Sequence, residues 1–283
     1  RGVLQWNRVA AEARARPRTR TRRSRHISRS RWGFHNLVVK ATVDAARSAC
    51  TMIRHGVVLL LCCFLAGCSI PVPAKAPLSD AQQCVTLPSP SLDGGHSVEE
   101  ALLARRSVRD FLDEELRLEE AAQLLWAAPG VTSERGGRTA PSAGALYPLE
   151  VYLVALRVEG LEAGVYRYAP KEHALLRVRG GDAGRELSDA SAGQRFIGSA
   201  AAVIVVTAVY ERTTAKYGER GIRYVHMEAG HAAQNVCLQA TALNLGCVTI
   251  GAFSDEQVHS MLGSPADESP LYLLPVGRVP PAS

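Results

Sequence analysis

The stretch AAAVIVVTAV at Ala200–Val209 constrains the fold more than any other part of this sequence. It is almost wholly apolar and rich in β-branched residues, which is typical of a strand rather than a helix. A strand with apolar side chains on both faces has to be covered on both faces. We therefore predict that Ala200–Val209 is a buried strand in the middle of a sheet.

Other parts of the chain carry weaker signals for strands and helices. Apolar runs with β-branched and aromatic residues predict further strands at 149–156, 164–168, 174–178, 248–250 and 271–276. Apolar residues at steps of three and four predict helices at 97–106, 118–128, 221–245 and 254–262. Ser97 and Glu100 form a capping-box pattern, Pro129-Gly130 is a stop signal, and Gly246 is predicted to end the long helix.

The positive charge of the chain is concentrated in its first 51 residues. They hold 13 Lys and Arg against only Glu12 and Asp44, whereas the chain from Cys68 onward has 19 basic and 25 acidic residues. Residues 1–51 lack apolar periodicity, which predicts a disordered Arg-rich segment or translated sequence upstream of a start at Met52; an RNA-binding arm is the alternative. The remainder is net negative, so we expect no nucleic-acid partner for it.

Residues 52–67 have the pattern of a bacterial secretion signal. A ten-residue apolar run, Val57–Ala66, precedes Gly67 and Cys68. The run is about half of the ~20 residues that a spanning helix needs, so a signal peptide is favoured over a transmembrane helix or a buried strand. Leu65-Ala66-Gly67-Cys68 resembles a lipobox. This implies cleavage before Cys68, a lipid on its thiol, and a periplasm-facing protein anchored in the bacterial cell envelope.

The Pro- and Ser-rich residues 68–95 predict an extended tether, followed by one globular domain over 96–283. Three cysteines lie beyond the lipobox, namely Cys84, Cys237 and Cys247. None has the spacing of a zinc or redox motif. We expect Cys237 and Cys247 to be small buried hydrophobic residues, with a disulfide between them as the minor alternative.

Three motifs of the predicted domain carry residues suited to binding an anionic, flat ligand. The guanidinium groups in Arg105-Arg106-Ser107-Val108-Arg109 repel one another unless an anion or solvent separates them, and they suit a phosphate; a basic helix end is the alternative. The loop Arg138–Pro148 has small residues that let backbone amides approach a ligand. Arg278 ends the last predicted strand, where it could reach the same anion.

Together and in this order, the motifs resemble the nitroreductase family over residues 98–278. The resemblance implies an α+β fold with a central, mostly antiparallel sheet flanked by helices, a homodimer, and FMN as the cofactor. It also implies the residues that bind FMN. The phosphate and ribityl chain would be held by Arg105, Arg106, Ser107, Arg109 and Arg278, and the flavin ring would lie against Pro141, Ser142, Ala143 and Gly144 and against Thr249, Ile250 and Gly251.

Two further features resemble the SagB-type branch of the family, the azoline dehydrogenases. Gly144–Pro148 stands where many nitroreductases have an Asn, and Lys216-Tyr217 precedes the long helix. In that branch a Lys-Tyr pair is associated with removing a ring proton as hydride passes to flavin, so the resemblance implies this role for Lys216 and Tyr217. A desolvated Lys can act as a general base and a neighbouring Tyr can donate or relay a proton. The alternative is that the pair only leads from a loop into the helix.

We therefore expect an FMN-dependent oxidoreductase that acts on a small molecule or a peptide azoline. His226 and His231 lie ~140° apart around a helix, so they do not face one metal. No GxGxxG follows a predicted strand, so NAD(P)H would bind only transiently, over the flavin. The alternatives are an NAD(P)H-dependent nitro or quinone reductase and a lipid-tethered flavin-binding protein without turnover.

Overall fold

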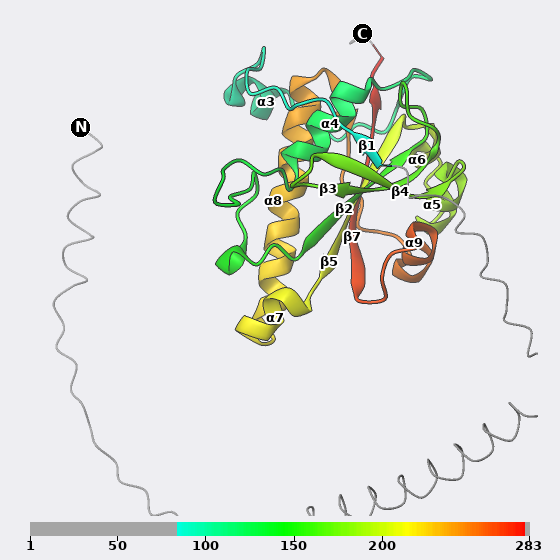
Figure 1. The fold of residues 1–283 in the computed structure, drawn as a ribbon. Helices are drawn as coiled ribbons and strands as arrows, with labels where there is room; N and C mark the ends of the chain where they lie inside the picture. Colours follow the sequence, from blue (N-terminus) through cyan, green and yellow to red (C-terminus); the bar gives the residue numbers. More distant parts are fainter. Residues whose placement is uncertain (1–83, 281–283) are drawn as a thin grey trace, which may run out of the picture. The chain divides into compact units, whose positions relative to one another are not determined.

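The computed structural model describes residues 84–280, which contain a seven-stranded sheet (Figure 1). The strand order is β1-β4-β3-β2-β5-β7-β6, and all neighbouring strands are antiparallel. The strands are β1 Cys84–Thr86, β2 Leu149–Ala155, β3 Gly164–Ala169, β4 Ala174–Gly180, β5 Ala202–Val209, β6 Leu245–Cys247 and β7 Glu268–Arg278. The predictions for residues 1–51, for the signal at 52–67 and for Cys68 lie outside the described residues.

Helices pack on both faces of this sheet (Figure 1). They are α3 Val98–Ala104, α4 Leu118–Ala127, α5 Gly184–Ala190, α6 Phe196–Ser199, α7 Glu211–Tyr217, α8 Arg220–Ala242 and α9 Asp255–Leu262, with a 3-10 turn η1 at Ala143–Ala145. Helices α4 and α8 share one core with the sheet, and α5, α6 and α9 share the other. The predicted α+β fold with an antiparallel sheet is confirmed. No helix within residues 84–280 is long and apolar enough to cross a membrane.

Strand β5 confirms the prediction made from its apolar sequence. All of its residues are buried, and it lies between β2 and β7. Ile204 and Val206 face the core that contains α4 and α8, whereas Val203 and Val205 face the core that contains α5 and α9. The absence of polar alternation in the strand therefore reflects two covered faces.

The helix start and stop signals near α3 and α4 also operate as predicted. The N–H of Glu100 donates to Ser97 Oγ at 3.1 Å, and the N–H of Ser97 donates to a Glu100 carboxylate oxygen at 2.7 Å. At the end of α4, a β-carbon added to Gly130 would lie 2.3 Å from the Trp126 carbonyl oxygen. Gly130 is therefore required where the chain leaves this helix.

The end of the long helix differs from the prediction. Helix α8 ends at Ala242, and Asn244, with φ of 57°, occupies the left-handed conformation that was expected of Gly246. Gly246 instead pairs with Gly277 in the sheet, where a β-carbon on it would lie 2.5 Å from a Val279 methyl group. The glycine is needed for close strand packing. The strand predicted at 248–250 lies at Leu245–Cys247 instead.

Sequence patterns did not predict the short helices α5, α6 and α7, which have at most seven residues each. Such helices are too short to show a full apolar period. The predicted domain start at residue 96 is also too late. Cys84–Thr86 pairs with β4, Leu87 is buried in the core, and the N–H of Ser91 donates to Gln123 Oε1 at 2.8 Å. This part of the predicted tether belongs to the domain.

Candidate functional site

The Arg105–Arg109 segment runs beside β6, the last strand in the sheet order. Arg105 is the C-cap residue of α3. Ser107 forms a parallel bridge with Cys247, and the N–H of Val108 donates to the Cys247 carbonyl at 3.0 Å. Backbone pairing with the edge strand of the sheet therefore fixes the backbone positions from which the side chains of this motif extend.

The arginines of this motif have different surroundings. Arg106 is bonded to its own backbone, because its Nη1 donates to the carbonyls of Leu103 and Arg105 at 2.9 and 2.8 Å. The guanidinium carbon of Arg109 lies 5.9 Å from the ring centre of Phe196. Within residues 84–280, neither Arg105 nor Arg109 forms an ion pair with a carboxylate. Their charges are uncompensated by the described part of the chain.

A pair of buried thiols lies next to Arg105. Sγ of Cys237 on α8 is 3.8 Å from Sγ of Cys247 on β6, and both cysteines are free. Their predicted burial is confirmed. The hydrogen bond with Cys247 lowers the pKa of the Cys237 thiol; burial opposes this effect and the charge of Arg105 supports it. The positive charge of Arg105 thus acts on the thiol of Cys237, where α8 packs against β6.

Arg278, in contrast, has a partner within the protein. Its two terminal nitrogens donate to the two carboxylate oxygens of Glu120 at 2.9 and 2.8 Å, and Arg117 donates to the same carboxylate at 2.9 Å. Burial alone would raise the pKa of Glu120, but the hydrogen bonds from Arg117 and Arg278 outweigh it and lower the pKa. The sequence did not predict Glu120, although a Glu inside the apolar stripe of α4 is a signal for a buried ion pair.

Thr249, Ile250 and Gly251 follow β6, separated from it by Val248. Ile250 is buried and exchanges backbone hydrogen bonds of 2.8 and 3.0 Å with Leu273, whereas Thr249 and Gly251 are exposed. Because β6 also carries Cys247, which pairs with Ser107, this segment and the arginine motif adjoin the same strand. The structure thus brings two of the predicted motifs together.

The loop at 138–147 is held to its surroundings by side chains. The hydroxyl of Thr139 donates to the Ala128 carbonyl at 2.9 Å, and Asn235 on α8 donates to the Thr139 carbonyl at 3.3 Å. The N–H of Tyr147 donates to Ser142 Oγ at 2.9 Å. The Arg138 guanidinium carbon lies 4.4 Å from the ring centre of Tyr147.

The backbone of this loop is strained. Gly144, Ala145 and Tyr147 have φ values of 66°, 54° and 48°, which lie in the left-handed region. Non-glycine residues in this region cost about 1–3 kcal/mol each and persist where the surroundings impose them, often at functional sites. Pro141 and Gly144 are exposed, and Ser142 and Ala143 are partly buried. The predicted ring-lining residues therefore lie on an accessible, tightly folded loop.

Lys216 and Tyr217 lie against this loop. They end α7, and Gly218, with φ of 59°, separates them from α8. A β-carbon added to Gly144 would lie 2.7 Å from the Tyr217 hydroxyl oxygen and 3.0 Å from Lys216 Nζ. The predicted catalytic pair and the predicted ring-lining loop are therefore in contact, and the pair belongs to a helix of its own rather than to a loop.

Glu228 is a further residue of this region that the sequence prediction omitted. It lies on α8, is 5% exposed, and shares a hydrogen bond with the side chain of Ser142. Burial raises the pKa of Glu228 to about 7, although Ser142 and Arg138 act in the opposite direction. The sequence signal for the burial of Glu228 was its position next to Ala229, within the apolar stripe of α8.

Helix α8 connects the two groups of predicted residues. Cys237 lies at the Arg105 end, Asn235 holds Thr139, and Glu228 holds Ser142. At a rise of ~1.5 Å per residue, the helix positions of Glu228 and Cys237 are about 14 Å apart along its axis. The uncompensated positive charge and the strained loop are therefore separated along one helix, as the two ends of an elongated ligand would require.

A cavity of about 480 Å³ lies elsewhere, between residues 91–98 and helices α4 and α8. Trp126, Thr139 and Asn235 are among its lining residues. None of the predicted site residues lines it. It touches the loop from the side of Thr139, away from Gly144.

Comparison with known proteins gives consistent matches. The model of the nitroreductase family matches residues 102–278. A protein of Methanocaldococcus jannaschii that is provisionally named a nitroreductase is 50% identical over 181 residues, which cover 64% of this chain and 90% of the relative. The match to the family model includes all of the predicted site residues except Cys68, the predicted lipidation site.

Two solved structures have a similar fold. A provisionally named nitroreductase from Ralstonia eutropha has a TM-score of 0.63 and 30% identity, covering 72% of this chain and 93% of its own. A chain in the Escherichia coli microcin synthetase complex McbBCD, solved with truncated pro-MccB17 bound, has a TM-score of 0.55 and 26% identity. That match covers 75% of this chain and 83% of the E. coli chain.

Proposed function

The chain belongs to the nitroreductase family of oxidoreductases, and on this premise we propose that it binds FMN and acts as a SagB-type dehydrogenase on azoline rings of a peptide. The observation that carries the dehydrogenase assignment is the contact of Gly144 with Lys216 and Tyr217. Similarity to a microcin synthetase chain that was solved with a pro-peptide supports a peptide substrate.

In this proposal Arg105, Ser107 and Arg109 hold the phosphate of FMN. Within residues 84–280, the guanidinium groups of Arg105 and Arg109 have neither a carboxylate partner nor a backbone carbonyl acceptor, and they fit an anion because charge-assisted hydrogen bonds to phosphate would compensate them. Arg106 and Arg278, which the family resemblance also implies, use donors for Leu103 and Glu120, so they would contribute only through their remaining N–H groups.

Pro141, Ser142, Ala143 and Gly144 would lie along the flavin ring, with Thr249, Ile250 and Gly251 on the segment after β6. Small side chains and exposed backbone at Gly144 and Gly251 let main-chain donors approach a flat ring. When bound, FMN would supply two-electron hydride chemistry. The protein would supply position and proton transfer.

Lys216 would take the proton that an azoline ring releases during its oxidation. The Lys216 side chain is exposed at the end of α7, so a substrate can reach it, and a bound substrate would supply the desolvation that favours the neutral amine needed to accept a proton. The Tyr217 hydroxyl lies beside the same point above Gly144 and would donate a hydrogen bond to the reacting ring. Reduction of a nitro compound or quinone by NAD(P)H, and flavin binding without turnover, are the rival functions.

A spectroscopic experiment on the full chain separates these functions. Absence of a flavin band, together with no uptake of added FMN, would exclude the flavoenzyme proposal. If FMN binds, anaerobic mixing with a thiazoline-containing peptide should bleach the flavin, and Lys216→Ala should slow bleaching without releasing FMN. Bleaching by NADPH but not by the peptide would support the reductase, and inertness to both would support binding without turnover.

We also propose that the protein is a homodimer anchored through Cys68 in the bacterial cell envelope and facing the periplasm. In support of a dimer, α3 leaves Val98, Leu102 and Leu103 exposed, at 65%, 54% and 77%. Sedimentation of the full chain and of Leu103→Lys tests the dimer. Membrane fractionation of Cys68→Ala tests the anchor, because the variant should be lost from the membrane fraction.

A further inference from the structure

We propose that Arg212 is a positioning residue that clamps the loop 141–147 against Lys216 and Tyr217. The proposal rests on the function proposed above for that pair. Arg212 lies in the first turn of α7, one helical turn before Lys216. Residues four apart project from the same face of a helix, so Arg212 and Lys216 face the same side of α7.

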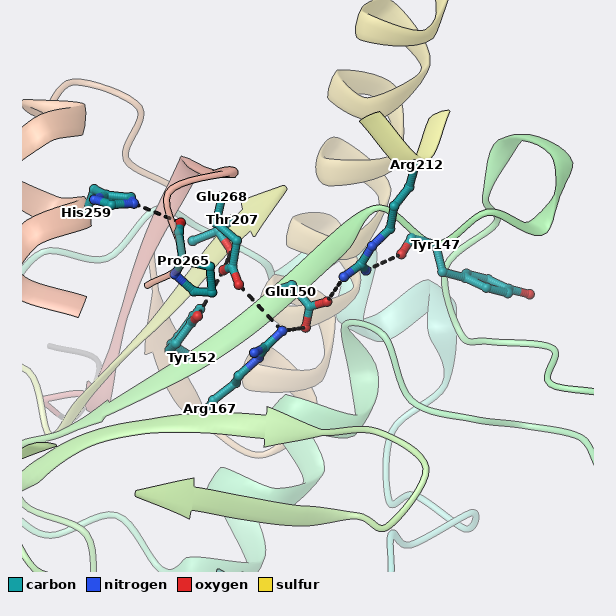
Figure 2. Close-up of polar contacts among 9 residues, drawn as sticks. All are labelled: Tyr147, Glu150, Tyr152, Arg167, Thr207, Arg212, His259, Pro265 and Glu268. Carbon is teal, nitrogen blue, oxygen red and sulfur yellow. Dashed lines mark hydrogen bonds and ion pairs between the residues drawn. The ribbon is translucent and has the colours of Figure 1, made fainter. Parts of the chain in front are cut away.

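Arg212 contacts the far end of the loop. Its Nη1 donates to the carbonyl of Tyr147 at 3.1 Å, and its Nη2 donates to Glu150 at 2.6 Å (Figure 2). Lys216 and Tyr217 contact the near end, at Gly144. One short helix therefore holds both ends of a loop segment of four residues.

The segment between these contacts is the strained one. Ala145 and Tyr147 have positive φ values without being glycines. Such conformations persist only when the surroundings over-determine them. The Arg212 bond to the Tyr147 carbonyl and the Ser142 bond to the Tyr147 N–H fix both sides of that residue. Arg212 thus supplies a contact that keeps the loop in its strained shape.

The clamp is anchored in the interior of the sheet. Glu150 on β2, which accepts the Arg212 bond, also pairs with Arg167 on β3 at 3.0 Å (Figure 2). Arg167 lies 3.4 Å from Glu268 on β7, whose side chain is 1% exposed. The hydroxyls of Tyr152 and Thr207 donate to Glu268 at 2.9 and 2.8 Å.

This network distinguishes Arg212 from an ordinary surface ion pair. Glu150 is 13% exposed and is held by two guanidinium groups, so its carboxylate has little freedom to move. The pair of Arg179 and Glu186 has the same chemistry at 2.8 Å, and Arg179 is about as exposed as Arg212, at 36% against 40%, but its carboxylate partner is 51% exposed where Glu150 is 13% exposed. An exposed pair of this kind contributes little to structure. Arg179 is therefore a matched control for Arg212.

The test uses the full chain with Arg212→Gln, Arg212→Lys and, as the control, Arg179→Gln. Hydrogen exchange of the Ala145 and Tyr147 amides, which donate to Ser142 in the structure, reports the loop without any cofactor. We expect exchange roughly tenfold faster in Arg212→Gln, because local opening becomes easier. Arg179→Gln should leave exchange unchanged, and Arg212→Lys should recover part of the protection through Glu150.

The second measurement is made on FMN-loaded protein with a thiazoline-containing peptide. Flavin reduction should slow about tenfold in Arg212→Gln at near-constant FMN affinity, since misplaced groups lose rate before binding, and Arg212→Lys should restore part of the rate. Unchanged amide exchange would overturn the clamp whether or not FMN binds. Faster exchange with an unchanged rate would overturn the positioning role alone. Failure to bind FMN, with exchange altered as expected, would refute the proposed function but retain the clamp.

Discussion

The two regions that adjoin α8 are built in opposite ways. The Arg105–Arg109 segment is fixed by backbone pairing with β6, and Arg105 and Arg109 have no carboxylate partner within residues 84–280. The loop at 138–147 has backbone pairing at its start, where the N–H of Thr139 donates to the Gly130 carbonyl, whereas side chains fix its strained part next to Lys216 and Tyr217. In the Arg105–Arg109 segment, positive charge is therefore available for a ligand. In the loop, the polar groups form hydrogen bonds that stabilise its conformation.

Unlike Arg105 and Arg109, Arg278 has a carboxylate partner, Glu120, and we expect the largest effect from removing that carboxylate. Glu120→Ala leaves Arg278 partly buried without a partner, and the free energy of unfolding should fall by about 3–5 kcal/mol. Chemical denaturation measures the change. Glu186→Ala, which breaks an exposed pair, should cost about 0–1 kcal/mol. Equal losses in the two variants would mean that the Glu120 carboxylate does not anchor Arg278.

The next largest effect tests the shape of the loop. Gly144→Ala introduces a β-carbon 2.7 Å from the Tyr217 hydroxyl, and we expect substrate-driven flavin reduction to slow by about 100-fold. Gly160→Ala is the control, because Gly160 has a similar φ of 71° but no atom within 4 Å of the added carbon. Both variants should lose about 1–2 kcal/mol of stability from backbone strain alone. Similar rates in the two variants would refute the contact as the cause.

Glu228 makes the loop region sensitive to pH. The folded protein retains this proton up to about pH 7, whereas the unfolded chain releases it near the ordinary pKa of 4.5. Folding therefore takes up a proton between these values, and the free energy of unfolding should fall as pH rises through this window. The fall is on the order of 2 kcal/mol, measured as the difference from Glu228→Gln, which cannot titrate. A constant difference between pH 4.5 and 7 would contradict the buried protonated state.

The smallest effect is expected on FMN binding, from removing one arginine that has no carboxylate partner. Arg105→Ala should weaken FMN binding roughly tenfold, which corresponds to about 1.4 kcal/mol for one charge-assisted contact. Arg106→Ala is matched in charge, but its guanidinium is bonded to the Leu103 and Arg105 carbonyls, so we expect a smaller loss. Fluorescence titration of FMN compares them. An effect of Arg106→Ala as large as that of Arg105→Ala would remove the distinction between bonded and uncompensated arginines.

Sequence patterns predicted the central elements of the fold well and the short ones poorly. β5 was evident because every residue of Ala202–Val209 is apolar or small, and α3 because Ser97 and Glu100 cap it. Helix α7 was not evident, since a helix of seven residues has no repeating apolar period. Gly246 was assigned to a helix end because a glycine after a helix is the commonest stop, but strand packing required it.

For the candidate site, the sequence by itself determined which residues can bind an anion or transfer a proton, and it placed them in separate parts of the chain, at 105–109, 216–217 and 278. It could not determine which arginines have partners, because Glu120 meets Arg278 across 158 positions of the chain. The contact of Gly144 with Lys216 and the burial of Glu228 were likewise decided only by tertiary structure. Pairing and desolvation depend on neighbours in space, and local sequence patterns do not contain them.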